Sequence, residues 1–226
     1  MYDYRDYCPI AKAAQLLCER WTLLVVRELL DGATRFNELR RFLPRISPSL
    51  LNDRLRLLER HGVVVRRRIP EQRGFEYQLT PAGRDLEPIV MALGVWGARW
   101  SDAQLTEDEL NAELLARDVS KRLVLDALPS GRVVVCLKFT DVQGADTWYI
   151  RAENGATEVC DEPRWLDVDV YVTSDVRTLT AVWLGREPIG PALRDGRIKV
   201  AGTPAYVRSV DAWLGRSPFA AAIAQT

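Results

Sequence analysis

The residues best suited to chemistry in this chain of 226 residues are arginines and small polar side chains, and they are concentrated in one stretch. Residues 35–73 carry 11 basic and four acidic side chains, a net charge of +7, although the whole chain is formally neutral. Within this stretch the segment SPSLLNDRLRLLERHG is followed at once by VVVRRR. A neutral protein with one strongly basic segment is expected to bind a localised anionic partner.

Catalytic chemistry is not expected. His61 is the single histidine, which argues against Ser-His-Asp catalysis and against histidine-rich metal sites. Its plainer interpretation is a solvent-facing residue near a helix C-terminus, where partial positive charge is favourable. The sequence has no Gly-rich phosphate loop, no metal-ligand spacing and no paired catalytic carboxylates. We therefore expect no enzyme activity, no metal and no cofactor.

The cysteines and the N-terminus indicate the cellular setting. Cys8, Cys18, Cys136 and Cys160 form no CxxC pair, and a chain of this length does not need disulfides to fold. The N-terminal segment MYDYRDYCPI is too polar for a signal peptide, and no apolar run reaches the length of a membrane span. A reduced, cytoplasmic setting is expected.

The basic segment begins with a predicted helix over residues 47–61. Ser47 suits the N-cap, and Pro48 suits the first helical turn. At about 100° per residue, one arc is predicted to be buried and carries leucines: Leu51, Leu55 and Leu58. The opposite arc carries polar side chains: Ser49, Asn52, Asp53, Arg56 and Arg60. Arg54 falls beside the leucines, so its stem should pack while its head reaches the rim.

The elements around this helix follow a recognisable order. Two helices are predicted in PIAKAAQLLCERWTLLVVRELLDG, with a break near residues 19–22, and a short helix in RFNELRRFLP. Cys18 lies inside the first of these and is expected in the core. After the basic helix, VVVRRRIP and FEYQLT are typical of two strands joined by the turn PEQRG. Thr80 and Pro81 then begin one long helix, PAGRDLEPIVMALGVWGARW, with an apolar stripe.

This order predicts a helix-turn-helix followed by a two-stranded wing. An α-helix fits the major groove of DNA with its N-terminal part nearest the bases, and hairpin arginines can reach phosphates or the minor groove. We therefore expect helix 47–61 to contact bases and the wing over 64–78 to contact the backbone. The alternative is that the arginines form only a solvated face. The predicted DNA contacts are Arg35, Ser47, Ser49, Asn52, Asp53, Arg56, Arg60, Arg66, Arg67, Arg68 and Arg73.

Three stretches carry a family resemblance: CPIAKAAQLLCERWTLLVVRELLDGATRFNELRR, ISPSLLNDRLRLLERHGVVVRR and YQLTPAGRDLEPIVMALGVWG. Across roughly residues 7–100 the chain resembles the HxlR family of bacterial winged-helix transcription regulators. The resemblance implies a homodimer joined through the N-terminal helix and the long helix after the wing. It also implies a twofold-symmetric double-stranded DNA operator, bound by one recognition helix per subunit.

The resemblance also concerns Cys8, which occupies the place where family members typically carry a cysteine. In some members this cysteine senses oxidants or electrophiles, and a thiol at a helix N-terminus is expected to be reactive. The alternative is an inherited, unreactive packing residue.

The second half of the chain differs in pattern. Residues 101–112 are a polar linker that leads into a helix expected to end near Leu128. Strands are predicted in RVVVCLKF, TWYIRA, ATEVC, LDVDVYVTS and RIKVAG, and helices in DVRTLTAVWLG and TPAYVRSVDAWLG. The expected fold class is multidomain: a mainly-α winged helix-turn-helix domain over 1–103, then an α+β domain with an antiparallel sheet over 104–226.

Residues of about 110–215 are similar to the sterol carrier protein type 2 domain, best in DVDVYVTSDVRTLTAVWLGREPIGPALRDGRIKVAG and the closing helix. The similarity implies a lipid-sized apolar cavity between sheet and helices. Tryptophans could line that cavity or simply fill the core: Trp148, Trp165, Trp183 and Trp213. The predicted ligand pocket is Trp148, Val168, Val170 and Trp183.

Together these observations predict a cytoplasmic, homodimeric DNA-binding regulator with a second domain for which two roles stay open. It could bind a hydrophobic small-molecule effector that modulates DNA binding, or residues 110–226 could merely enlarge the dimer or recruit a partner. The alternative is a carrier of lipids or hydrophobic small molecules whose N-terminal half serves only dimerisation. The segment of net charge +7 disfavours the carrier, and salt-dependent DNA binding would separate the two hypotheses.

Overall fold

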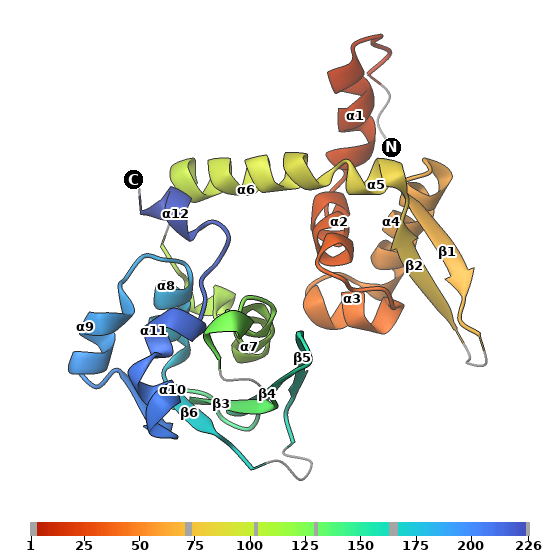
Figure 1. Cartoon of the computed structure of the whole chain (residues 1–226). Coiled ribbons are helices and arrows are strands. Elements are labelled where there is room, and N and C mark those ends of the chain that lie inside the picture. The colour runs from red at the N-terminus through yellow and green to blue at the C-terminus, as the bar shows by residue number, and fades with distance from the viewer. Residues whose placement is uncertain (1–3, 71–73, 102–103, 129–130, 163–166, 225–226) are drawn as a thin grey trace. The chain divides into compact units, whose positions relative to one another are not determined.

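The structure is a computed structural model that describes residues 4–70, 74–101, 104–128, 131–162 and 167–224. The chain divides into two compact units, Met1–Gly94 and Val95–Thr226 (Figure 1). Each unit has its own hydrophobic core. The domain boundary expected at residues 103–104 stays a prediction.

The N-terminal unit has the predicted order of helices and a hairpin. Its elements are α1 (Pro9–Leu17), α2 (Thr22–Leu30), α3 (Phe36–Phe42), α4 (Pro48–Arg60), β1 (Val64–Arg68), β2 (Phe75–Leu79), α5 (Pro81–Arg84) and α6 (Glu87–Trp100), the last of which continues beyond Gly94. The strands β1 and β2 pair antiparallel, with Val64 opposite Leu79. The Tyr77 N–H donates to the Thr34 carbonyl (2.7 Å), so the segment before α3 extends the hairpin sheet.

Helix α4 contributes the centre of the N-terminal core, as its leucine spacing predicts. The predicted leucines are all buried: Leu51, Leu55 and Leu58. They pack in one cluster with Val25 and Val26 of α2 and with Leu39 of α3. Burial of these aliphatic side chains fixes the side of α4 that faces the unit, and therefore the side that faces solvent.

The single long helix expected over residues 81–100 is wrong, because the chain forms α5 and α6 with a break at Asp85 and Leu86. Pro88 accounts for the break. A proline has no N–H to donate, and its ring clashes with the carbonyl four residues earlier, here that of Arg84. The start of α5 is as predicted: the Thr80 hydroxyl accepts a hydrogen bond from the Gly83 N–H (3.2 Å).

The C-terminal unit combines a five-stranded sheet with short helices. Its elements are η1 (Glu107–Glu109), α7 (Ala112–Lys121), η2 (Leu125–Ala127), β3 (Val133–Phe139), β4 (Thr147–Glu153), β5 (Ala156–Cys160), β6 (Val170–Ser174), α8 (Val176–Trp183), α9 (Ile189–Arg194), β7 (Ile198–Gly202), α10 (Pro204–Arg208), α11 (Val210–Trp213) and α12 (Ala220–Ile223). The strand order in the sheet is β5-β4-β3-β6-β7.

The expected all-antiparallel sheet is wrong in one pair, since β3 and β6 run parallel, with Val135 opposite Val170. Strands β3, β4 and β5 form an antiparallel meander, so β5 runs in the same direction as β3. Strand β6, the next strand along the chain, runs in this same direction and pairs with β3. Alternating hydrophobicity predicts a strand but not the direction of its neighbour.

Three element boundaries in this unit also differ from expectation. Helix α7 ends at Lys121 rather than near Leu128, because the Val124 N–H donates to the Trp213 carbonyl (3.0 Å) and the chain leaves the helix. The closing helix is split into α10 and α11 at Ser209, whose hydroxyl donates to the carbonyl of Ala205 (2.9 Å), a bond that bends helices. Strand β6 begins only at Val170.

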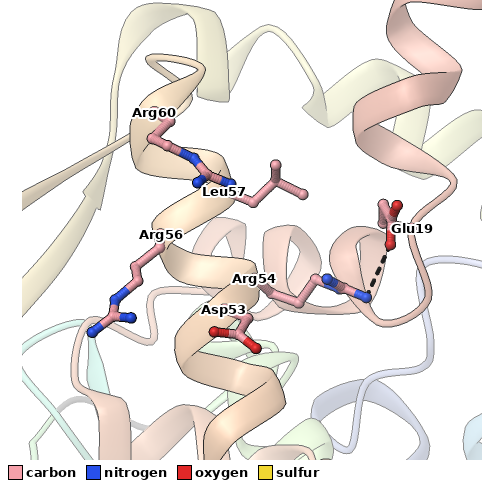
Figure 2. A pocket seen from close by; sticks show the side chains of 6 residues that line it. All are labelled: Glu19, Asp53, Arg54, Arg56, Leu57 and Arg60. Carbon is pink, nitrogen blue, oxygen red and sulfur yellow. Dashed lines mark ion pairs between the residues drawn. The ribbon is translucent and has the colours of Figure 1, made fainter. Parts of the chain in front are cut away.

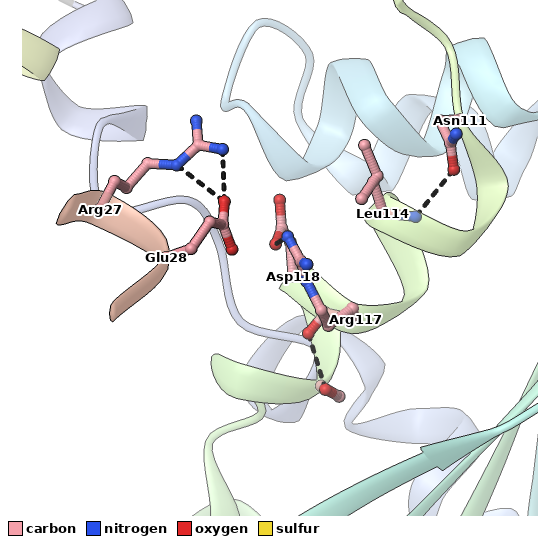
Figure 3. Close-up of polar contacts among 7 residues, drawn as sticks. Arg27, Glu28, Asn111, Leu114, Arg117 and Asp118 are labelled. Atoms are coloured by element: carbon pink, nitrogen blue, oxygen red, sulfur yellow. Dashed lines mark hydrogen bonds and ion pairs between the residues drawn. The ribbon is translucent and has the colours of Figure 1, made fainter. Parts of the chain in front are cut away.

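Side-chain contacts fix several helices locally (Figure 3). The Asn111 side chain caps α7 by accepting from the Leu114 N–H (2.9 Å). In α2 the Glu28 carboxylate, fully buried, accepts hydrogen bonds from Nε and Nη2 of Arg27 at 3.0 and 2.5 Å. The cap satisfies a backbone donor at the start of α7, and the charge-assisted hydrogen bonds give the buried carboxylate of α2 a partner.

Candidate nucleic-acid interface

The N-terminal end of α4 is built by Ser47, as predicted. Its Oγ accepts a hydrogen bond from the Leu50 N–H (3.3 Å) and lies 3.2 Å from the Oγ of Ser49. Pro48 occupies the first helical position, where its missing N–H costs nothing. The hydroxyl of Ser47 thus shapes the helix terminus, and Ser49 is exposed in the first turn.

The outer face of α4 carries the polar side chains that the spacing predicts. Asp53, Arg56 and Arg60 are exposed, and Asn52 is half-buried. A depression of about 220 Å³ runs along this flank and is lined by Glu19, Asp53, Arg54, Arg56, Leu57 and Arg60 (Figure 2). In the described part of the chain, Arg56 and Arg60 make no ion pair, so their guanidinium groups are available to an anionic ligand.

Arg54 differs from the sequence-based expectation, which had its head at the solvent rim. Only 15% of its side chain is exposed, and its guanidinium binds the turn between α1 and α2. Nε donates to the Arg20 carbonyl (2.8 Å), and Nη2 lies 3.0 Å from Oε2 of Glu19. Its angular position beside the leucines was the one signal in the sequence for this inward contact.

The wing presents its arginines on two faces. Arg66 and Arg68 alternate with Arg67 along β1, and all three are exposed. The guanidinium carbon of Arg66 lies 3.5 Å from the centre of the Phe75 ring, a cation–π contact that fixes its direction. Arg67 stands opposite Glu76 of β2. Arg73, also predicted to contact DNA, lies outside the described residues.

Helix α3 begins beside the wing. The Glu38 carboxylate accepts from the N–H groups of Thr34 and Arg35, both at 2.9 Å, and so satisfies two otherwise unpaired donors at the helix terminus. Arg35 is exposed at this terminus and bridges to Glu76 of β2 through the backbone. The predicted contact residues that lie on α3, α4 and β1 thus come from three consecutive elements of one small unit.

Comparisons with known proteins agree with this geometry. Residues 16–105 match the model of the HxlR-like helix-turn-helix family. The uncharacterized HTH-type transcriptional regulator YvaP of Bacillus subtilis is 41% identical over 99 residues, which cover 43% of this chain and 92% of that protein. The chain belongs to the HxlR-like helix-turn-helix family.

Two further relatives match a similar share of this chain. The uncharacterized HTH-type transcriptional regulator sll1512 of Synechocystis is 38% identical over 110 residues, covering 48% of this chain and 82% of that protein. The reduced form of the transcriptional regulator YodB from B. subtilis is 31% identical and covers 44% of this chain and 100% of that one, with a TM-score of 0.39. As an HxlR-like protein, the chain is a helix-turn-helix transcriptional regulator, for which DNA is the implied partner.

The cysteines of this HxlR-like protein have different surroundings. Cys8 is half-buried and precedes α1, and its N–H donates to Oδ1 of Asp6 (3.0 Å). Cys18 was expected in the core but is exposed, because α1 ends at Leu17 and Cys18 is its C-cap. His61, the C-cap of α4, is exposed as expected. Among the described residues, no group of three or more His, Cys, Asp or Glu side chains could hold a metal ion.

The predicted ligand-pocket residues of the C-terminal unit lie in or next to its core. Trp148, Val170 and Trp183 are buried in that core, and Val168 is half-buried. Trp213 is fully buried there, and Trp165 lies outside the described residues. The HxlR match ends at residue 105, and the sterol-carrier resemblance stays a prediction. No helix in the described ranges combines the length and apolarity that crossing a membrane requires.

Proposed function

We propose that this HxlR-like regulator binds a specific DNA operator as a homodimer, with α4 in the major groove and the β1–β2 wing on the phosphate backbone. The observation that carries the proposal is the exposed polar face of α4 next to a hairpin whose outer strand ends in three exposed arginines. A capped helix can enter the major groove, and a positively charged hairpin can neutralise flanking phosphates.

The two parts of this surface have different tasks. Ser49, Asn52 and Arg56 lie on the outer arc of α4, the first two in its N-terminal half and Arg56 just past its middle. Side chains on this arc approach base edges, and Arg and Asn can bond bidentately to guanine and adenine. The arginines of the wing contact phosphates. Arg66 is already stacked on Phe75, so it presents a fixed charge, whereas Arg68 lies nearer the tip.

Dimerisation is supported by apolar side chains that the chain leaves exposed on two helical segments. Tyr7 and Ile10 at the start of α1 are 96% and 78% exposed, and Trp96 and Trp100 on α6 are 58% and 72% exposed. Ile89 and Leu93 continue the stripe on α6. Apolar surface of this kind is stabilised by burial against another protein, and a second copy supplies identical helices.

The test of DNA binding is selection of bound fragments from genomic DNA, followed by titration of the selected operator and a scrambled duplex at several salt concentrations. We expect Arg56→Ala to weaken operator binding and reduce the preference for operator over scrambled DNA by about 1–3 kcal/mol. Arg68→Ala should weaken the binding of both duplexes alike. It should also reduce the salt slope, the steepness with which log affinity falls against log salt concentration, by about 1.

The control is Arg194→Ala, which removes an exposed arginine from α9 of the C-terminal unit and should change neither quantity. If the wild-type protein binds no genomic fragment in preference to scrambled DNA, the proposal of sequence-specific binding is wrong. Equal preference in the wild type and in Arg56→Ala would mean that α4 does not contact the bases.

The dimer is tested by light scattering after size-exclusion chromatography. Ile10→Glu and Leu93→Glu place charges in the exposed apolar stripes and should produce monomers. Tyr171→Glu, at a side chain 44% exposed on β6, is the matched control and should leave the mass unchanged. A monomeric wild type at the concentrations used for DNA binding would exclude the dimer.

Two routes of regulation belong to the proposal. The C-terminal unit has a depression of about 380 Å³ that is lined by apolar side chains, among them Leu125, Leu128 and Val133, and by the polar Asp126, Glu153 and Asn154. It includes none of the predicted pocket residues, and we propose it as the site of a small-molecule effector with a hydrophobic part. If this ligand changes the affinity of the protein for DNA, then DNA must change the affinity of the protein for the ligand by the same factor. Titration with a fluorescent fatty acid, with and without operator, should therefore give two different affinities, and identical values would exclude this route.

The second route is oxidation or alkylation of Cys8 at the start of α1, a helix of the proposed dimer. Treatment with diamide should change the operator affinity of the wild type and leave Cys8→Ser unchanged. The same response in both proteins would assign the effect to another thiol, of which Cys18 is exposed.

A further inference from the structure

We propose that Arg54 positions the recognition helix α4 for operator binding without contacting DNA, by fastening the helix to the turn between α1 and α2. This inference rests on the proposed function, in which α4 contacts bases. It gives a role to the one arginine of α4 that points into the unit, whereas Arg56 and Arg60 are exposed.

Two contacts carry the proposal. Nε of Arg54 donates to the carbonyl of Arg20 at 2.8 Å, and Nη2 lies 3.0 Å from Oε2 of Glu19. The side chains of Arg54 and Glu19 are only 15% and 24% exposed. Charge-assisted hydrogen bonds with partly buried partners are stronger and better ordered than exposed ion pairs, which contribute little. Arg54 is thus committed to the turn.

The turn itself has an unusual backbone. Trp21 has a φ of 76°, a left-handed conformation that a bulky residue seldom adopts. Its carbonyl accepts from the Val25 N–H (2.9 Å) and thereby begins α2, which has no side-chain cap. Such a conformation persists only where its surroundings stabilise it. The bond from Arg54 to the preceding carbonyl is one such stabilising contact, and it joins the end of α1 to the middle of α4.

The same contact controls charge on the proposed DNA-binding surface. The Glu19 carboxylate lines the depression that also includes Arg56 and Arg60 (Figure 2). Figure 2 shows Arg54 directed toward Glu19, and Arg56 directed to the other side of the helix. Without Arg54, the Glu19 carboxylate would lose one positive neighbour, and the potential beside the cations that face DNA would become less favourable for phosphate. Arg54 therefore both orients α4 and neutralises Glu19.

The test compares variants of the full-length protein with the operator and scrambled duplexes described above. Arg54→Met keeps an unbranched apolar stem and removes the guanidinium. We expect it to weaken operator binding about tenfold, because the orientation of α4 is relaxed. Binding of scrambled DNA should fall less, and the salt slope should stay at the wild-type value, because no phosphate contact is lost.

Two readouts separate positioning from a general loss of structure. Adding Glu19→Gln to Arg54→Met should restore part of the lost operator affinity, because a negative charge is removed from the depression that Arg56 and Arg60 also line. Hydrogen exchange of the amides in residues 19–22 should become faster in Arg54→Met and remain unchanged in Arg56→Ala. Arg54→Lys retains charge and stem but cannot bridge both acceptors as the planar guanidinium does, so its affinity should be intermediate.

Several outcomes would overturn the proposal. Wild-type operator affinity in Arg54→Met would show that the contact does not matter for recognition. An equal loss for both duplexes with a salt slope lower by about 1 would identify Arg54 as a phosphate contact instead. Should Arg54→Met fail to fold, wild-type operator affinity in Arg54→Lys would also refute it. A wild-type protein that does not prefer its selected operator would contradict the proposed function itself.

Discussion

Helix α6, which begins in the N-terminal unit and continues beyond Gly94, and the core of the C-terminal unit place their tryptophans differently. On α6, Trp96 and Trp100 are 58% and 72% exposed, whereas Trp148, Trp183 and Trp213 of the C-terminal core are at most 8% exposed. The C-terminal core thus buries these three tryptophans by itself. The N-terminal segment and α6 leave apolar surface exposed, and in the proposed dimer a second copy covers it.

Several surface arginines of the two units also differ in their partners. In the C-terminal unit, Nη2 of Arg151 lies 2.6 Å from Oε2 of Glu158, and Arg197 hydrogen-bonds Glu187 and thereby lowers the pKa of that carboxyl. On the described surface of the N-terminal unit, Arg56, Arg60 and Arg68 make no ion pair. Residues 1–100 carry 17 basic and 12 acidic side chains, and residues 101–226 carry 14 and 19. The unmatched positive charge lies where an anionic partner is proposed.

The largest effect is expected from a core truncation in each unit, which tests whether the two cores are independent. Leu51→Ala and Ile150→Ala each remove a side chain with no exposed surface, so each should lower the free energy of unfolding by about 2–5 kcal/mol. If the units have independent cores, Leu51→Ala should abolish operator binding while fatty-acid binding persists. Ile150→Ala should do the opposite. Calorimetry and the two binding assays measure this.

The matching control for both truncations is Leu24→Ala, at a side chain on α2 that is 39% exposed. It should lower the free energy of unfolding far less than either core truncation. A single unfolding transition that shifts equally in both core variants would show that the units unfold together, and the contrast drawn above would then not extend to stability.

A smaller loss of stability is expected at two glycines: Gly62, which follows α4, and Gly83 of α5, which packs against Val63. A Cβ on Gly83 would lie 2.2 Å from the carbonyl oxygen of Val63, so Gly83→Ala should cost about 1–3 kcal/mol through overpacking. Gly62 has open space around it but a φ of +68°, so Gly62→Ala should cost about 1 kcal/mol through backbone strain. Chemical denaturation gives both values, and a larger loss in Gly62→Ala would contradict this ranking.

Much of the N-terminal unit was predictable because its local signals agree with its packing. The Ser47 cap, the leucine arc of α4 and the Gly-containing turn of the hairpin each specify one structure, and the structure confirms the helices and strands that they predict. The exposed arc of α4 follows from the same spacing. The candidate site could be proposed from sequence because its charged residues belong to consecutive elements.

The remainder depends on contacts distant in sequence. Arg54 binds Arg20, 34 residues away, and no local pattern predicts that partner. The parallel pairing of β3 with β6 joins strands that are distant in sequence, and alternation does not show the direction of a neighbouring strand. The break before α6 was visible in principle as Pro88, but the apolar stripe on both sides of it favoured one continuous helix.

After the glycine substitutions, the next smaller loss of stability is expected from removing the N-caps of two helices, one in each unit. Ser47→Ala removes the cap of α4, and Asp175→Ala removes the cap of α8, whose Oδ1 accepts from the Thr178 N–H at 2.7 Å. Each should lower stability by about 1 kcal/mol. Only Ser47→Ala should also reduce operator affinity, because the first turn of α4 faces the bases in the proposed complex. Ser47→Gly should restore most of the stability, and reduced operator affinity in Asp175→Ala would show that the C-terminal unit takes part in DNA binding.

The last prediction concerns pH and the C-terminal sheet, where the effect is confined to alkaline pH. Burial raises the pKa of the Cys136 thiol from 9.0 to about 11, and burial also raises that of neighbouring Tyr149. The folded state therefore binds the thiol proton more tightly than the unfolded state, so this stabilisation is complete below pH 9 and is lost progressively as the pH rises toward 11. The free energy of unfolding of the C-terminal unit should fall over this range, with a shallower slope in Cys136→Ala, where only the tyrosine contribution remains. Denaturation at pH 8, 9, 10 and 11 measures the slopes, and equal slopes in the two proteins would mean that Cys136 ionises as freely in the folded state as in the unfolded chain.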